Sequence, residues 1–386
     1  MHPLLLHLLI LLFATSAWLS INSIYVELPV LVPIVPESWN FATYVVVLIQ
    51  LSCIFPFIYS IIRMWKPTNT SSIEPVLVIA LLVIDVIGLV MTTFTYKSTT
   101  IVDGVEHSVL LFLSIFILCI PCTMADVVFL PFIGTLGPSS FITTFYIGMG
   151  VGALIPSLLS FAQNPSETSS NFSFPIFIYI ICIFVFISCI AYIILLIYNR
   201  NMPVEQDTVT VKERENSTDS LPITFPLTVS LVGGALQNAI LPSILSYAAS
   251  PFGGQTYSLS TTLFVLTNPL FCFIQHFYSF SSSLHLSLLS IFILFPIAFI
   301  VTLSLVPLNV PSVLLPISSA LSAGLLSLLR TASASRLASS SHPRALFFCG
   351  ASTQVPYSTY RSPVIHYHVP SLPPFVSPFS SVVSSV

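Results

Sequence analysis

Three carboxylic acids stand inside long apolar stretches of this chain, where an ionisable group is costly. Glu27 lies in YVELPV, Asp85 in LLVIDVIGLV and Asp126 in CTMADVVFLPF. An ionised side chain at the centre of a bilayer costs about 2.5–3.5 kcal/mol on insertion scales, so such residues usually face a partner or a water-filled cavity. The chemistry expected of them is proton coupling or gating. Glu27 and Asp126 are expected near helix ends, so contact with interfacial water is the competing interpretation.

Two amide side chains occupy similar settings in the two halves of the chain. Asn22 precedes a Leu-Pro pair at 28–29, and Asn238 precedes a Leu-Pro pair at 241–242. A proline inside a helix frees a backbone carbonyl and bends the helix, which a membrane tolerates only beside protein or a water-filled cavity. Interrupted helices at corresponding positions of two halves are typical of a midplane substrate site in a transporter. The spacing from amide to proline differs, so the symmetry is only suggestive.

The composition indicates a polytopic membrane protein that positions these residues on helices. Hydrophobic residues make up 55% of the 386 residues, charged residues only 6%, and the mean hydropathy is +0.99. A soluble globular chain carries about 25% charged residues. The net charge is -3 and the few basic residues form no stripe, so we expect no nucleic-acid partner. We expect the lipid bilayer to surround the protein.

About 20 mainly apolar residues are needed to cross a bilayer, and the sequence offers ten such windows and a weak eleventh. They fall at 4–26, 42–62, 75–96, 108–130, 141–162, 174–198, 223–246, 257–278, 284–306 and 311–329, with the eleventh beginning near Ala345. The first window resembles a secretory signal, but its apolar run continues to Val32 without a basic residue ahead of it, so we expect a retained helix.

The basic residues predict the orientation, because lysine and arginine are enriched in cytoplasmic loops. With a cytoplasmic amino terminus, only Lys97 and Arg361 fall outside, whereas the cytoplasmic set is Arg63, Lys66, Arg200, Lys212, Arg214, Arg330, Arg336 and Arg344. The sequon at Asn171 then lies outside, where it is open to glycosylation, and the sequons at Asn69 and Asn216 lie inside.

A charged, apolar-poor stretch divides the chain. We expect an N-terminal six-helix bundle over 1–198, a cytoplasmic polar linker over 199–222, a C-terminal bundle of four to five helices over 223–355, and a Ser/Pro-rich tail over 356–386.

Enzyme chemistry is not expected. The seven cysteines lie in or beside apolar runs, which favours buried free thiols over disulfides. The histidines are scattered, and only His366 and His368 have ligand spacing, so neither a metal site nor another cofactor is predicted. The Cys119–Cys122 pair has redox spacing but lacks a soluble βαβ context.

Several motifs together resemble the animal riboflavin transporters, a solute carrier family. The run WLSINSIYVELP over 18–29, followed by PESW over 36–39, is similar to the family pattern W-x-x-x-N-G-x-W-V-E-L-P and L-P-E-G-W. The likeness continues at Cys122-Thr123, at 129–132, at Gly148 to Pro156, at 237–243 and at 268–270. It covers residues 8 to about 355 in order.

The resemblance implies a major-facilitator-like carrier of about eleven helices in a six-plus-five arrangement, which takes up riboflavin across the plasma membrane without ATP. The flavin ring has a flat face for stacking and an edge of acceptor, donor and acceptor, and its ribityl chain needs hydroxyl partners. Amides suit the edge and aromatics the face. The polar candidates are Asn22, Thr123, Gln237, Asn238 and Asn268, and the stacking candidates are Trp18, Tyr25, Phe129 and Tyr146. Ordinary helix packing or lipid contact is the competing interpretation for each aromatic.

The chain also departs from the family pattern. Met149 stands where relatives carry Gln or Glu, and Asp126 where they commonly carry Asn or Ser, so substrate preference or coupling is open. The six prolines of the tail forbid a continuous eleventh helix, which is the basis for the hypothesis of a frameshifted or mis-spliced end after Val355. The alternative to a carrier is a transport-inactive receptor or scaffold that retains the helices.

Overall fold

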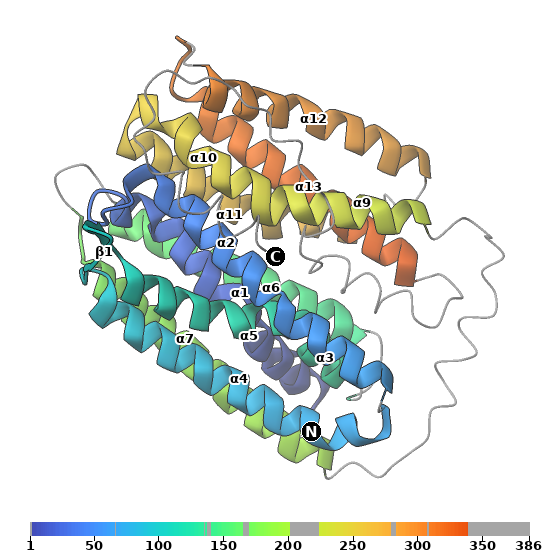
Figure 1. The fold of residues 1–386 in the computed structure, drawn as a ribbon. Helices are drawn as coiled ribbons and strands as arrows, with labels where there is room; N and C mark the ends of the chain where they lie inside the picture. Colours follow the sequence, from blue (N-terminus) through green and yellow to red (C-terminus); the bar gives the residue numbers. More distant parts are fainter. Residues whose placement is uncertain are drawn as a thin grey trace. The chain divides into compact units, whose positions relative to one another are not determined.

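The structure, a computed structural model, describes residues 2–65, 67–134, 136, 140–164, 170–200, 224–278, 283–306 and 309–338. These residues are nearly all helical (Figure 1). The first half holds α1 (Pro3–Leu31), η1 (Ser38–Asn40), α2 (Phe41–Ser52), α3 (Ile54–Trp65), α4 (Pro67–Thr95), α5 (Val109–Gly134), α6 (Ser140–Gln163) and α7 (Phe174–Arg200). The second half holds α9 (Thr224–Ala235), η2 (Leu236–Ile240), α10 (Leu241–Ala249), η3 (Ser250–Phe252), α11 (Gly254–Phe277), α12 (Ser283–Leu305) and α13 (Leu314–Ala338).

The helices confirm a multi-pass membrane protein. Within the described ranges, nine helical segments are long and apolar enough to cross a membrane. Two of them join several elements, since α2 and α3 form one segment and α9, η2 and α10 form another. The window predicted at 257–278 corresponds to α11, a tenth long helix of more polar composition. The predicted eleventh helix near Ala345 and the tail lie outside the described residues.

One predicted helix boundary is wrong. The tenth helix was expected to end at 329 and to leave Arg330 in a cytoplasmic loop, but α13 continues to Ala338. The helix continues because Arg330 has a polar partner inside the protein, described below, and because Leu337 at its far end is buried. Arg336, which was also expected in this loop, lies in the last turn of α13.

A short β-hairpin, which the sequence patterns did not predict, connects α4 to α5. Strands β1 (Thr100–Val102) and β2 (Val105–His107) pair antiparallel, with Val102 opposite Val105. The two turn residues, Asp103 and Gly104, have φ of 51° and 83°. Positive φ at both positions of a two-residue loop is typical of the turn that matches the strand twist, and Asp-Gly favours it.

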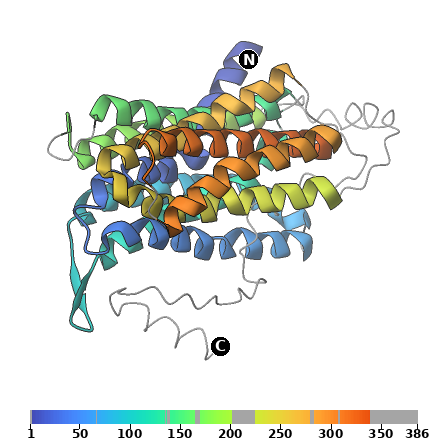
Figure 2. The same cartoon turned by 90° about the horizontal axis from the view of Figure 1, so that it is seen from above.

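The helices pack within each half of the chain, and a few of them also join the two halves. In the first half, α1 packs against α5, α6 and α7, and α4 packs against α5 and α7. In the second half, α11 and α12 pack against α13, and α9 packs along α13 (Figures 1 and 2). The halves meet where α1 and α6 contact α11 and where α2 contacts α10 and η2.

Glycines allow α6 to approach its neighbours closely. A Cβ atom at Gly148 would lie 2.5 Å from the carbonyl oxygen of Leu11 and 2.6 Å from Cβ of Ala14, so only glycine fits against α1 there. A Cβ at Gly150 would lie 2.9 Å from Cβ of Pro269 on α11. The glycines thus let α6 pack closely against α1 and α11, next to Asn268.

Candidate functional site

The segment that carries Gln237 and Asn238 departs from regular α-helix. Residues 236–240 form the π-helical turn η2 between α9 and α10. Such turns widen the helix by one residue and are frequent at functional sites. The Leu-Pro pair that follows begins α10, and Pro242 has no N–H to donate to the carbonyl of Asn238 one turn earlier. The irregularity therefore lies at the two amides that the sequence had singled out.

Gln237 is the centre of a hydrogen-bonded cluster that joins η2 to α11 and α13. Its side chain is only 5% exposed. Its Nε2 donates to Oδ1 of Asn268 at 2.9 Å and to Oγ of Ser327 at 2.7 Å. Its Oε1 accepts from Nη1 of Arg330 at 2.9 Å, and the Ser327 hydroxyl donates to Oδ1 of Asn268 at 2.9 Å. We call Gln237, Asn268, Ser327 and Arg330 the amide cluster.

A second set of predicted residues lies on one face of α1. Trp18, Asn22 and Tyr25 follow one another at helical spacings of four and three residues. Tyr25 reaches the other half of the protein, because its hydroxyl donates to the backbone carbonyl of Asn238 at 3.3 Å. Asn22 and Asn238 are half-buried, and their side-chain amides have no hydrogen-bond partner among the described residues. The structure thus places the two predicted amides on either side of the Tyr25 contact.

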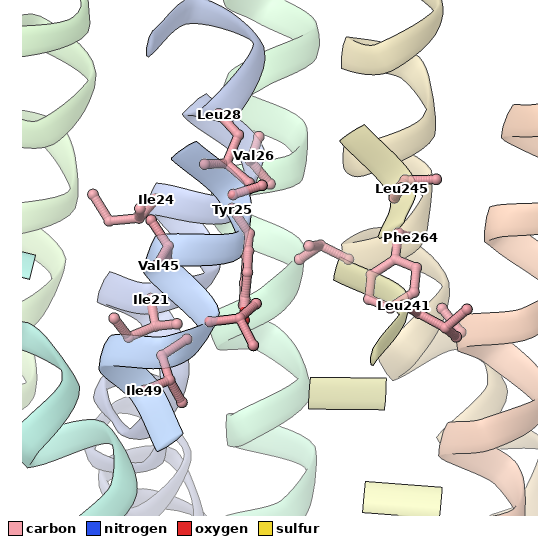
Figure 3. Packing of buried hydrophobic residues seen from close by; sticks show 14 of the residues in the cluster. Ile21, Ile24, Tyr25, Val26, Leu28, Val45, Ile49, Leu241, Leu245 and Phe264 are labelled. Atoms are coloured by element: carbon pink, nitrogen blue, oxygen red, sulfur yellow. The ribbon is translucent and has the colours of Figure 1, made fainter. Parts of the chain in front are cut away.

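An apolar plug adjoins the Tyr25 contact. Leu28 on α1, Leu245 on α10 and Phe264 on α11 lie around a small cavity beside Tyr25 (Figure 3). The cavity that they enclose with Tyr25 is about 10 Å³, which is about the room of one water molecule. The path between the halves is therefore closed at this level.

Polar contacts close the same end of the protein beyond the plug. The Tyr247 hydroxyl on α10 donates to Oδ1 of Asn40 at 2.8 Å and lies 3.3 Å from the Thr43 hydroxyl on α2. The rings of Trp39 and Tyr257 lie 5.5 Å apart. We call these five residues the end seal. They join η1 and α2 to α10 and α11.

The buried carboxylates lie away from the amide cluster in sequence and have few partners. Glu27 is fully buried, so the expected contact with interfacial water is wrong for it. Its Oε2 accepts from Nε2 of Gln163 on α6 at 3.4 Å, and its Oε1 has no partner among the described residues. Asp85 is 2% exposed and lies beside Ser20 of α1, and no described residue bonds its Oδ1. Asp126 is half-buried.

Four further predicted site residues differ in burial, and their role in binding stays a prediction. Thr123 is fully buried, and its hydroxyl bonds the carbonyls of Cys119 at 3.0 Å and Ser52 at 3.3 Å between α5 and α2. Phe129 is 1% exposed, with its ring 4.8 Å from Phe13. Trp18 is half-buried between two apolar clusters, and Tyr146 is 44% exposed.

The sequence did not single out Arg330, Ser327 or Gln163 as site residues. The sequence contained a signal for Arg330. It lies in LLSLLRTAS, where helix-forming residues both precede and follow it, so the spanning helix could have been predicted to include it. Ser327 and Gln163 gave no signal, because a single serine or glutamine in an apolar helix is common and its partners are distant in sequence.

Other expectations have separate outcomes. Asn171 is exposed, and its Nδ2 donates to the carbonyl of Ala162 at 2.8 Å, so glycosylation there stays a prediction. Six cysteines are free thiols as expected, and the seventh, Cys349, lies outside the described residues. No group of three metal-ligating side chains occurs in the part of the chain that the structure describes.

Solved structures with the same helix arrangement are transporters. The crystal structure of a D-xylose-proton symporter aligns with a TM-score of 0.54 at 12% identity, covering 92% of this chain and 88% of that one. A bacterial homolog of the human lysosomal transporter Spinster aligns with a TM-score of 0.51 at 16% identity, covering 91% and 78%. The fold is that of major-facilitator-type transporters.

Sequence comparison defines the family within that class. Residues 2–220 and 197–357 match the family described as solute carrier family 52, riboflavin transporter, and the chain belongs to this family. Riboflavin transporter rft-2 of Caenorhabditis elegans is 28% identical, with 90% of this chain and 92% of the relative covered. Riboflavin transporter 2 of Salmo salar is 27% identical, with 75% and 78% covered. Riboflavin transporter member 3 of Homo sapiens is 33% identical over 166 residues, 43% of this chain.

Proposed function

We propose that this protein takes up riboflavin across the plasma membrane by alternating access, without ATP hydrolysis and with its amino terminus in the cytoplasm. Family membership supports the substrate class. The observation that carries the proposal is the set of amides at the meeting of the two halves, where α1 contacts η2 through Tyr25 and Asn238. Transporters place their substrate sites at such interrupted helices near the midplane.

The chemistry of these residues suits a flavin. Asn22 and Asn238 have free amides, each with both donor and acceptor capacity, for the pyrimidine edge of the ring and the ribityl hydroxyls. Tyr25 offers an aromatic face beside them, and rings stack on flat π systems with a contribution of about 0.5–1.5 kcal/mol. Asn268 extends the polar surface into the second half. Thr123 and Phe129 make contacts between helices, Thr123 with Ser52 of α2 and Phe129 with Phe13 of α1.

The plug and the end seal provide one gate of an alternating-access cycle. Both lie at the end of the protein where α1 and α10 terminate, which the basic-residue bias assigns to the outside. In the proposed cycle, breaking the Tyr247 contacts and separating Leu28 from Leu245 opens the site outward. The contacts between α6 and α11 at Gly150 and Pro269 are where the halves pivot.

Proton coupling is the proposed task of Glu27 and Asp85. Each is a carboxyl group inside a spanning helix with a buried oxygen that no described residue bonds. Asp126 is a weaker candidate because it is half-buried and lies toward the opposite end of α5 from the hairpin. If riboflavin uptake does not change between pH 5.5 and 8, the coupling hypothesis is wrong. If uptake depends steeply on pH and this dependence is lost in Glu27→Gln or Asp85→Asn, the hypothesis is supported.

The test is radiolabelled riboflavin uptake into cells that express this chain, with surface amounts matched. We expect saturable uptake that Asn22→Ala abolishes or weakens at least tenfold. The control is Asn164→Gly, because Asn164 is exposed at the end of α6 and its φ of 47° suits glycine. Surface protein that binds riboflavin without moving it would favour the receptor alternative, and surface protein that does neither would refute the proposal.

A further inference from the structure

Arg330 is an arginine inside a spanning helix without an acidic partner. It lies in the segment Leu314–Ala334, and no carboxylate pairs with it among the described residues. Its Nη1 donates to Oε1 of Gln237, and its Nε is buried with no partner among the described residues. Charged residues within membrane helices are costly and usually mark a substrate or ion path.

Snorkelling to the membrane surface does not explain this placement. Arg330 lies about two helical turns before the end of α13, within reach of the interface for a long side chain. Its guanidinium is directed instead to Gln237, a residue that is 5% exposed in the middle of the second half. Its aliphatic stem packs on Gly233 of α9, where an added Cβ would lie 3.3 Å from Cγ of Arg330.

The guanidinium fixes the direction of every hydrogen bond in the amide cluster. Arginine has five N–H donors and no acceptor, so only the oxygen of the Gln237 amide suits it. The nitrogen of Gln237 must therefore face Asn268 and Ser327. Because that nitrogen is a donor, Asn268 must turn its oxygen toward it. The amide assignments, which depend on the hydrogen-bond network, are thus fixed by one residue.

As a consequence, the amide cluster offers mainly hydrogen-bond donors to a substrate. Oδ1 of Asn268 already accepts from both Gln237 and Ser327, so the capacity that Asn268 has left is its Nδ2 group. This Nδ2 has no acceptor among the described residues, and Asn268 is half-buried beside the α6 contact at Pro269. The remaining Nη donors of Arg330 likewise meet no acceptor in the described ranges. Asn268 and Arg330 therefore have no hydrogen-bond acceptor left for a donor on the substrate.

We infer that Arg330 is a positioning residue for specificity: through Gln237 it holds Asn268 as a hydrogen-bond donor, so that this half of the site selects substrates by their carbonyl oxygens. The inference rests on the proposed function and adds to it which atoms of the flavin meet the second half. The two carbonyl oxygens on the pyrimidine edge of the ring are the acceptors that match. The N3–H between them finds its acceptor on another residue.

The test compares riboflavin with two analogues in which sulfur, a weaker acceptor, replaces the oxygen at C2 or at C4. Wild-type chain is expected to show a KM roughly 2 to 12 times higher for one of these analogues than for riboflavin, in line with the strength of a hydrogen bond to an uncharged acceptor. In Arg330→Met the Gln237 amide is free to turn over, and the ratio of the two KM values falls toward one because riboflavin alone loses affinity. Arg330→Lys keeps a donor-only cation and keeps most of the ratio. Arg336→Met removes another arginine from the same helix and is the control.

The outcomes separate the inference from the proposed function. If wild-type chain at the cell surface takes up no riboflavin, the proposed function fails and this inference with it. If wild-type uptake is saturable but Arg330→Met keeps the wild-type ratio, the inference alone is overturned. Equal loss for all three flavins in both Arg330→Met and Arg330→Lys shows a purely structural role and also overturns it.

Discussion

Gln237→Glu reverses the polarity of the amide cluster without changing its shape. Glutamate has the same number of heavy atoms as glutamine, and one carboxylate oxygen still accepts from Arg330, now as an ion pair in place of the 2.9 Å hydrogen bond. The other oxygen stands where Nε2 donated to Asn268 at 2.9 Å and to Ser327 at 2.7 Å. Two acceptors cannot face each other at that distance, so the Asn268 amide turns over and the Ser327 hydroxyl rotates.

The magnitude follows from which atom Asn268 then presents. After the turn, Nδ2 is used inside the cluster and Oδ1 faces the substrate, so a flavin carbonyl meets an acceptor instead of a donor. A buried polar group without its partner costs about 1–3 kcal/mol, which corresponds to a Kd for riboflavin roughly 5 to 160 times higher. The fold should be retained, because Arg330 keeps an acceptor and every group in the cluster is again paired.

The assay is a fluorescence titration of riboflavin into purified protein, beside thermal unfolding of the same sample. Gln237→Met is the matched variant: it leaves Arg330 with no acceptor among the described residues and is expected to lower the free energy of unfolding by about 1.5–3 kcal/mol, the range for hydrogen bonds to charged groups. Unchanged riboflavin affinity in a well-folded Gln237→Glu protein would refute the reasoning. Equal unfolding temperatures for the glutamate and methionine variants would refute its structural half.

Three further predictions concern the helices around the site. Gly148→Val is expected to destabilise the protein by about 1–3 kcal/mol, because even a Cβ there lies 2.6 Å from Cβ of Ala14; thermal unfolding measures this, and an unchanged midpoint contradicts it. Glu37→Ala removes the acceptor that lies 2.9 Å from the backbone amide of Ser108, just before α5, and should lower the free energy of unfolding by about 1–3 kcal/mol. If the hairpin instead moves and exposes that amide to water, stability changes less and hydrogen exchange at Ser108 becomes faster. Tyr247→Phe removes the hydroxyl of the end seal and should favour the outward-open state, so that a thiol reagent applied from outside labels a cysteine placed near the plug faster than in the parent; an equal labelling rate would exclude a gating role for that hydroxyl.

The helices were predictable because a bilayer imposes a length and a composition on each of them. The ten windows read from apolar runs correspond to α1 through α13, and boundaries failed where polar interactions inside the protein replaced water. Arg330 is the clearest case, since a basic residue after an apolar run ordinarily ends a membrane helix. The β1–β2 hairpin was missed because its strands are three residues each, too short for a periodic pattern.

Only part of the candidate site was predictable from the sequence, namely the polar residues that stand out within apolar helices. The two interrupted helices meet through the bond from Tyr25 to the Asn238 carbonyl, and binding by Asn22 and Asn238 stays a prediction. Thr123 shared a motif with them but bonds its own helix and Ser52, because a threonine hydroxyl reaches the preceding turn more easily than a distant ligand. The connection of Gln237 to Arg330 spans 93 residues of sequence, and no local pattern encodes such a pairing.

The most direct test of the account is exchange of riboflavin by the purified protein in liposomes. Vesicles loaded with unlabelled riboflavin are diluted into a trace of radiolabelled riboflavin, without ATP, and label inside is followed over time. The account predicts transient accumulation of label above the level of empty liposomes, lost in Asn22→Ala and preserved in Asn164→Gly. Folded, inserted protein that exchanges no riboflavin at any pH between 5.5 and 8 would contradict it.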